Sequence, residues 1–108
     1  MTTYQYLVGS HIWVKQTPQW NAVMETFSLP MFSDSQRSRL MQWVDLDNRY
    51  VDWEAIHHEA VHYTPEQRTL LRIAHALHQD GDCQLSELGQ LSSAGRSAAI
   101  MLIGLRYR

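Results

Sequence analysis

Apolar residues recur every three or four positions along most of the chain, which is the spacing of amphipathic helices. A helix is predicted to begin after Thr17, because threonine is a suitable N-cap and Pro18 suits the first turn. Its apolar face comprises Trp20, Val23, Met24 and Phe27. We expect Pro30 to end this segment, because proline cannot continue a helix.

Three further helix starts precede apolar stripes of the same spacing. They lie at Ser33 or Asp34, at Asp52 and at Thr64. Thr64 is the strongest of them, because its hydroxyl and the Gln67 side chain can form a reciprocal capping box. Each of these caps therefore predicts a helix.

The C-terminal part of the chain contains two breaks. Asp80-Gly81-Asp82 interrupts the helical pattern, and a short helix opened by Ser86 is predicted before the second break at Ser92-Ser93. The last helix contains the apolar run Ala98 to Ile103 and is apolar nearly all round. We therefore expect it at the centre of the core.

The N-terminal residues 4–14 have a different character. They are rich in aromatic and β-branched types around Gly9-Ser10, which predicts a β-hairpin with a type II′ turn, and a short helix is the alternative. The predicted fold is mostly α: a compact single domain, residues 1–108, of five to six helices, with or without this N-terminal β-hairpin. An α+β fold, with the hairpin extended to three strands, is the alternative. Residues 1–63 form the N-terminal half and residues 64–108 a C-terminal helical trio.

Length and charge narrow the class of protein. The 108 residues suit one domain, and the net charge of -2 with a pI near 6.3 is unlike that of a dedicated nucleic-acid binder. The single cysteine, Cys83, cannot form an internal disulfide. No N-terminal signal pattern is visible, and no apolar run approaches the ~20 residues of a membrane span. We expect a cytoplasmic protein, in its own cell or in a host cell, with no membrane partner.

Residues 58–62 read His-Glu-Ala-Val-His. This pentapeptide resembles the signature of zinc metallopeptidases, and the resemblance implies His58 and His62 as metal ligands with Glu59 as general base. Tyr63-Thr64-Pro65 follows at once and should end the helix. Arg68 stands where a third histidine would be, so a distant carboxylate would have to complete the site. A small zinc-dependent hydrolase is therefore an alternative, and no cofactor is the favoured expectation.

The segment from Ser86 to Leu105 resembles the second and third helices of a DNA-binding helix-turn-helix. Gly89 would allow a close helix approach, Arg96 would reach base edges, and Arg106 and Arg108 would contact phosphates. The predicted break between the helices is about two residues short of the usual 3–4. DNA binding is thus a second alternative and is not favoured.

Residues 43–54 interleave four carboxylates with two tryptophans and a tyrosine. The candidate partner-binding residues are Trp43, Asp45, Asp47, Tyr50, Asp52, Trp53 and Glu54. If exposed, the aromatic rings would provide contact area and the carboxylates would pair with arginine or lysine of a partner. The alternative is that the rings point inward and the acids cap helices.

The favoured function is a small non-catalytic protein-binding module. In size and character the chain is similar to inhibitors from phages and mobile elements, such as anti-CRISPR proteins, and this likeness rests on no residue-level match. The partner is expected to be a protein whose identity the residues do not reveal. The chain is not expected to be an enzyme.

Overall fold

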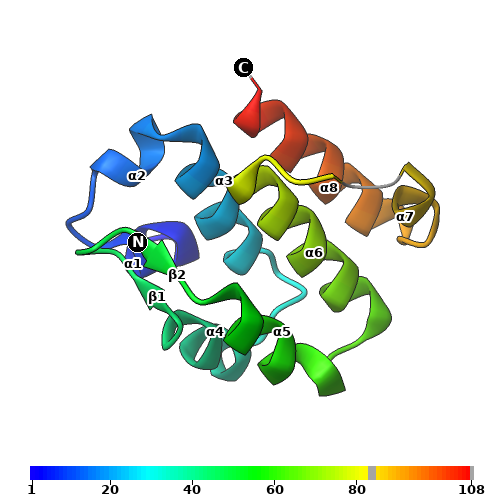
Figure 1. Ribbon diagram of the computed structural model, residues 1–108, viewed down its shortest axis with the longest axis horizontal. Coiled ribbons are helices and arrows are strands. Elements are labelled where there is room, and N and C mark those ends of the chain that lie inside the picture. Colours follow the sequence, from blue (N-terminus) through cyan, green and yellow to red (C-terminus); the bar gives the residue numbers. More distant parts are fainter. Residues whose placement is uncertain (83–84, 108) are drawn as a thin grey trace.

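The structure is a computed structural model that describes residues 1–82 and 85–107, so the expectations for Cys83 and Arg108 lie outside the described residues. The elements in chain order are α1 (Thr3–Val8), α2 (Trp13–Gln16), α3 (Pro18–Phe27), α4 (Asp34–Met41), β1 (Val44–Asp45), β2 (Tyr50–Val51), α5 (Trp53–Glu59), the 3-10 turn η1 (Ala60–His62), α6 (Pro65–Gln79), α7 (Leu85–Gly89) and α8 (Ser93–Arg106). The predicted mostly α fold is confirmed (Figure 1).

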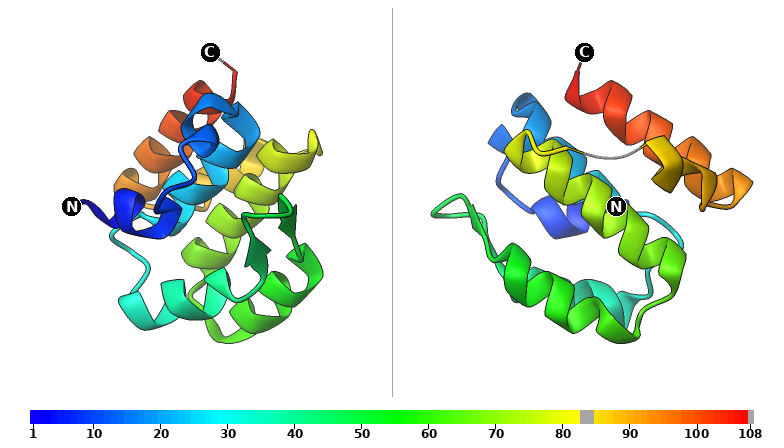
Figure 2. Two further views of the ribbon diagram at one scale, coloured as in Figure 1. Left: turned by 90° about the vertical axis from the view of Figure 1, so that its left-hand side faces the viewer. Right: turned by 45° about the vertical axis from the view of Figure 1, so that its right-hand side comes forward.

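Helix α3 forms the centre of the core. It packs against α1, α2, α6 and α8, and seven of its ten residues are buried. The small residues Ala22 and Thr26 of this helix are also fully buried. The Thr26 hydroxyl is satisfied because it donates to the Ala22 carbonyl at 2.7 Å. Around this helix, α6 and α8 lie side by side on one flank, while α4, α5 and the hairpin occupy the opposite end of the molecule (Figures 1 and 2).

The helix starts follow the predicted caps. Ser33 and Thr64 each form a full capping box, and the Asp52 carboxylate accepts from the Ala55 amide at 3.1 Å. Thr17 is the N-cap residue of α3 with proline next to it, as predicted, although its hydroxyl donates to the Trp13 carbonyl at 3.1 Å. Local capping chemistry therefore accounts for where these helices begin.

The expected N-terminal hairpin is wrong, and the alternative of a short helix is correct. Thr2 forms a capping box with Gln5, which starts α1, and Gly9 ends it with a positive φ of 59° that glycine adopts without strain. These local backbone bonds outweigh the strand preference of the aromatic residues. The small antiparallel hairpin lies instead at β1 and β2.

The last helix, α8, is not at the centre of the core. Its fully buried residues are Gly95, Ala99 and Leu102, whereas Ile100 is 64% exposed. The small residue Gly95 permits the close approach of α8 to α6, since an added Cβ would meet the Glu66 carboxylate. Gly89, which was expected at a close contact, has no atom within 4 Å of such a position.

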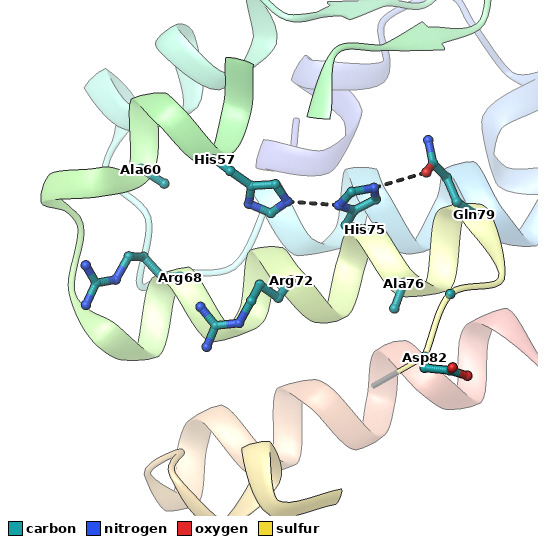
Figure 3. Close-up of a pocket in the computed structure, with 9 residues that line it drawn as sticks. His57, Ala60, Arg68, Arg72, His75, Ala76, Gln79 and Asp82 are labelled. Atoms are coloured by element: carbon teal, nitrogen blue, oxygen red, sulfur yellow. Dashed lines mark hydrogen bonds between the residues drawn. The ribbon is translucent and has the colours of Figure 1, made fainter. Parts of the chain in front are cut away.

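Helices α5 and α6 contact each other through histidines. His57 Nε2 on α5 lies 2.9 Å from His75 Nδ1 on α6, and His75 Nε2 lies 3.0 Å from the Gln79 side-chain oxygen (Figure 3). Apolar contacts of Ile56 and Ala60 with the core accompany this polar link. The position of α5 on α6 is therefore set by both packing and hydrogen bonds.

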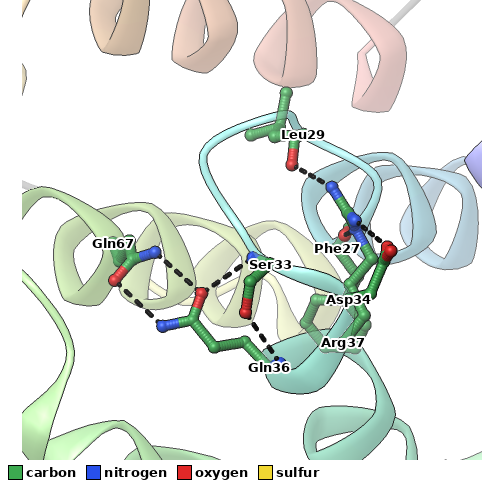
Figure 4. Close-up of polar contacts among 7 residues, drawn as sticks. All are labelled: Phe27, Leu29, Ser33, Asp34, Gln36, Arg37 and Gln67. Carbon is green, nitrogen blue, oxygen red and sulfur yellow. Dashed lines mark hydrogen bonds and ion pairs between the residues drawn. The ribbon is translucent and has the colours of Figure 1, made fainter.

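Arg37 on α4 is buried and holds the end of α3. Its Nε donates to the Phe27 carbonyl at 2.8 Å, and Nη2 donates to the Leu29 carbonyl at 2.8 Å (Figure 4). Its Nη1 pairs with the exposed carboxylate of Asp34 at 2.7 Å. The last carbonyls of a helix lack intrahelical partners, so Arg37 supplies donors that water would otherwise provide.

The two capping boxes also contact each other. The Gln67 amide nitrogen donates to the Gln36 side-chain oxygen at 3.0 Å (Figure 4). The same nitrogen donates to the Met31 carbonyl at 2.6 Å. The same Gln36 oxygen accepts from the Ser33 amide at 2.9 Å. The starts of α4 and α6 are thus held against one another and against the loop that follows α3.

We predict that Arg37→Met lowers the free energy of unfolding by about 2–3 kcal/mol, because the Phe27 carbonyl loses its buried donor. Urea denaturation followed by circular dichroism measures this change. Asp34→Asn is the matched control, and it should cost much less, because it removes only the exposed ion pair. Equal losses in the two variants would show that the ion pair, and not the carbonyl contact, matters.

Candidate functional site

The β1–β2 hairpin places an aromatic ring beside a carboxylate. Val44 pairs with Val51 and Asp45 with Tyr50, and the Asp52 amide donates to the Trp43 carbonyl at 2.9 Å. This register puts Trp43 opposite Asp52. Because side chains alternate along an antiparallel pair, Trp43 and Asp52 share one side of the hairpin while Val51 faces the core.

Helix α5 continues from Asp52 and divides its residues between two faces. Trp53, Ile56 and Ala60 are buried, at spacings of three and four. The opposite face carries Glu54, Ala55, His58 and Glu59. The hairpin and this outer face meet at the helix N-terminus, so residues of both surround one surface depression.

That depression, here called the acidic groove, has a volume of about 560 Å³. Its lining residues are Trp43, Asp52, Glu54, Ala55, His58 and Glu59. Trp43 is 38% exposed and provides the aromatic surface, while three carboxylates provide negative charge. No lysine or arginine stands among these lining residues. The groove therefore combines an accessible indole ring with uncompensated negative charge.

The remaining carboxylates of the 43–54 segment, Asp45 and Asp47, have partners outside the groove. Asp45 accepts from the Asn48 side chain at 2.7 Å and its backbone amide at 3.0 Å, and these bonds hold the pKa of Asp45 below its usual value. Asp47 lies 2.8 Å from His11 Nε2. Tyr50 is 60% exposed but does not line the groove. Only part of the predicted patch therefore forms one site.

Trp53, one of the candidate partner-binding residues, is 4% exposed and lies inside the molecule, so for this ring the alternative of an inward position is correct. Its ring stacks on His75 with centroids 4.7 Å apart and an interplanar angle of 8°. Its indole Nε1–H donates to His78 Nδ1 at 3.1 Å. A buried tryptophan needs such an acceptor, and His78 on α6 supplies it.

The hydrogen bonds assign the protonation of the buried histidines. Because Nδ1 of His78 accepts from Trp53, neutral His78 carries its proton on Nε2. His75 donates from Nε2 to Gln79, so its Nδ1 accepts from His57 Nε2 and leaves His57 Nδ1 unprotonated. Burial, with a smaller effect of nearby positive charge, lowers the pKa of both His57 and His78.

A second depression, here called the histidine cavity, lies between α5, α6 and residue 82 and has a volume of about 520 Å³. Its polar lining residues are His57, Arg68, Arg72, His75, Gln79 and Asp82 (Figure 3). These residues were not predicted from the sequence to form a common site. The signal was present, because residues 68, 72, 75 and 79 follow one face of α6 at helical spacing.

The zinc motif does not assemble a metal centre in the structure. Helix α5 ends at Glu59 and His62 lies in the 3-10 turn η1, so the two histidines do not share one regular α-helical turn. His58 and Glu59 line the acidic groove, and His62 does not. Within residues 1–82 and 85–107, no group of three His, Cys, Asp or Glu side chains could hold a metal ion.

The helix-turn-helix candidate receives mixed support. Three residues separate α7 from α8, so the turn has ordinary length and is not too short as expected. Arg96 is exposed on α8. Arg106, however, donates to the Leu77 carbonyl at 2.8 Å and pairs with Asp80, so it closes the end of α6 and does not reach outward for phosphate. Arg108 lies outside the described residues.

In the described part of the chain, every helix is too short or too polar to cross a membrane. Comparison with protein-family models, with curated proteins and with solved structures found nothing that matches this chain. The site therefore has to be interpreted from its own chemistry.

From the pKa shifts of the histidines we predict that the free energy of unfolding is greatest near pH 6.5. Unfolded histidines titrate near 6.5, whereas folded His57 and His78 have lowered pKa values, so acidification below 6.5 favours the unfolded chain. His11 behaves oppositely, because its bonds to Asp47 and the Val8 carbonyl raise its pKa; its contribution is lost as pH rises above 6.5. Urea denaturation between pH 5.5 and 8 measures both effects.

Two variants separate the loss of stability below pH 6.5 from the loss above it. Asp47→Asn should flatten the decline above pH 6.5, because His11 loses its carboxylate partner. His57→Gln should reduce the decline on the acid side. A profile that these substitutions leave unchanged in shape would show that other groups govern the pH dependence.

Proposed function

We propose that this chain is a non-catalytic protein-binding module that receives an arginine side chain of a partner protein in the acidic groove. The observation that carries the proposal is the meeting of the exposed Trp43 ring with the carboxylates of Asp52, Glu54 and Glu59 in one depression. An aromatic face and several carboxylates in the same small space are the groups that recognise an organic cation.

Arginine fits this chemistry better than lysine. Its planar guanidinium can stack on the Trp43 indole and donate a pair of hydrogen bonds to one carboxylate at the same time. Ala55 keeps the groove open at its middle, because its methyl side chain leaves space between Glu54 and Glu59 on the outer face of α5. A lysine ammonium could pair with the carboxylates, but it has no planar group to stack on the Trp43 indole.

The hairpin and the start of α5, which form the groove, are held by contacts with neighbouring residues. A ligand can therefore bind without a rearrangement of these elements. Asp52 caps α5 through the Ala55 amide, and the hairpin is held to the N-terminal segment by His11 and by Arg49, whose guanidinium lies 4.1 Å from the Trp13 ring centre. Side chains on such supported elements lose little freedom when a ligand binds.

An inhibitor role is a narrower form of the same proposal. A surface that captures arginine can occupy a basic, nucleic-acid-binding groove on a partner and exclude nucleic acid from it. A small protein from a phage or mobile element would block a host system in this way. This narrower role requires that the captured arginine belong to a functional surface of the partner.

The proposal predicts that a short arginine peptide binds the groove. In ¹H–¹⁵N NMR titrations with acetyl-Gly-Arg-Gly-amide, the Trp43 indole and the amides of Glu54 and Glu59 should shift in a saturable manner. The same peptide with citrulline should cause no comparable shift, because citrulline keeps the shape and lacks the charge. Lysine in place of arginine should bind more weakly.

Two substitutions remove a negative charge from the groove, and a third, which removes one elsewhere, is the matched control. Glu59→Gln or Glu54→Gln should weaken the arginine peptide several-fold, whereas Asp82→Asn removes an exposed carboxylate away from the groove and should not. The proposal is wrong if citrulline and arginine peptides shift the same resonances equally, or if all three variants weaken binding alike.

A further inference from the structure

The histidine cavity is distinct from the acidic groove, because none of the residues that line the groove lines the cavity. Arg68, Arg72, His75 and Gln79 line one side of it along α6, and His57 faces them from α5 (Figure 3). Its volume of about 520 Å³ lies within the range of small-molecule sites.

Both arginines keep hydrogen-bond donors that can serve a ligand. Arg68 uses Nη1 for the Val61 carbonyl at 3.1 Å. Arg72 uses Nη2 for the Thr69 hydroxyl at 2.9 Å and Nε for Glu87 at 3.2 Å. A guanidinium has five N–H donors, so these bonds fix each side chain and leave donors over. The contact with Glu87 also shows that a carboxylate oxygen can reach Arg72.

The charges are unevenly distributed along the cavity. Asp82 is the acidic lining residue, and it follows the end of α6, where the chain turns back and the Gly81 amide donates to the Ala76 carbonyl at 2.9 Å. Near Arg68 and Arg72 the lining groups are cationic or neutral, with His57 between the arginines and His75. An anion bound at the Arg68 end would meet Arg68 and Arg72, and it would compete with the Glu87 carboxylate that lies 3.2 Å from Arg72 Nε.

His57 adds a titratable donor to this end. Its Nε2–H is committed to His75, so any added proton goes to Nδ1 without breaking that bond. Burial first, and then His75 and Arg72, lower the pKa of His57.

We propose that the histidine cavity binds a doubly charged oxyanion, in particular the phosphate group of a small phosphorylated molecule. Arg68 and Arg72 supply the permanent positive charge, and His57, protonated at Nδ1 when the anion is bound, supplies a third donor. Two guanidinium groups and an imidazolium match a tetrahedral dianion, which offers more acceptor oxygens than a carboxylate. The site is independent of the acidic groove and of its proposed function.

Sulfate is the first probe, because it remains a dianion between pH 5.5 and 8 and its pH dependence reports only the protein. At constant ionic strength adjusted with sodium chloride, NMR of the histidine ring nitrogens should show saturable binding of sulfate. Its affinity should rise about tenfold from pH 8 to pH 5.5, because protonated His57 binds the anion and the anion raises the pKa of His57.

Inorganic phosphate and glycerol 3-phosphate distinguish free phosphate from a phosphorylated molecule, and acetate tests a carboxylate. The phosphate ester should bind at least as tightly as inorganic phosphate, and acetate should bind much more weakly. Acetate binding as tight as sulfate, or shifts that depend only on ionic strength, would overturn the proposal.

Arginine variants complete the test. Arg72→Gln and Arg68→Gln should each weaken sulfate about tenfold or more, while Arg96→Gln removes an exposed arginine of α8 and should leave affinity unchanged. Circular dichroism checks that each variant is folded. Glu87→Gln should strengthen sulfate binding, because it removes the carboxylate that competes with the anion for Arg72. Equal effects of Arg72→Gln and Arg96→Gln would contradict a specific site.

Discussion

The indole of Trp53 is the contact on which both depressions of this molecule depend. It is the first residue of α5, its ring stacks on His75, and its N–H is bonded to His78 on α6. Burial of so large a side chain stabilises the fold by several kcal/mol, and the directional bond fixes how α5 lies on α6. A helix of seven residues has little stability of its own, so this tertiary contact determines its position.

The two faces of α5 follow from that position. The residues beside Trp53 in sequence, Asp52 and Glu54, are turned to the surface, where they meet Trp43 across the hairpin and form the acidic groove. One turn further, His57 is half-buried and meets the arginines of α6 in the histidine cavity. One short helix thus contributes carboxylates to the acidic groove and an imidazole to the histidine cavity.

Capping residues and helical spacing were sufficient to predict the six helices that follow residue 17, because these signals act over a few residues. The hairpin at Val44 and Val51 was missed, since two-residue strands leave almost no alternation to detect. Trp43, Asp52 and Glu54 of the candidate patch line one groove, whereas Trp53, for which the sequence left both an exposed and an inward position open, is buried. Whether a tryptophan lies inside or outside depends on a partner such as His78, 25 residues away, which local patterns do not reveal. The histidine cavity was missed for the same reason, because His57 and Arg72 meet only after α5 docks on α6.

The most direct test of this account is the hydrogen exchange of the two indole protons, together with an NMR experiment that detects coupling across N–H···N hydrogen bonds. At neutral pH the Trp53 Nε1 proton should exchange slowly and show a cross-peak to His78 Nδ1, while the Trp43 proton should exchange quickly with water. The account would be contradicted by rapid exchange at both indoles with no coupling to His78, because α5 would then lack the contact that positions both sites.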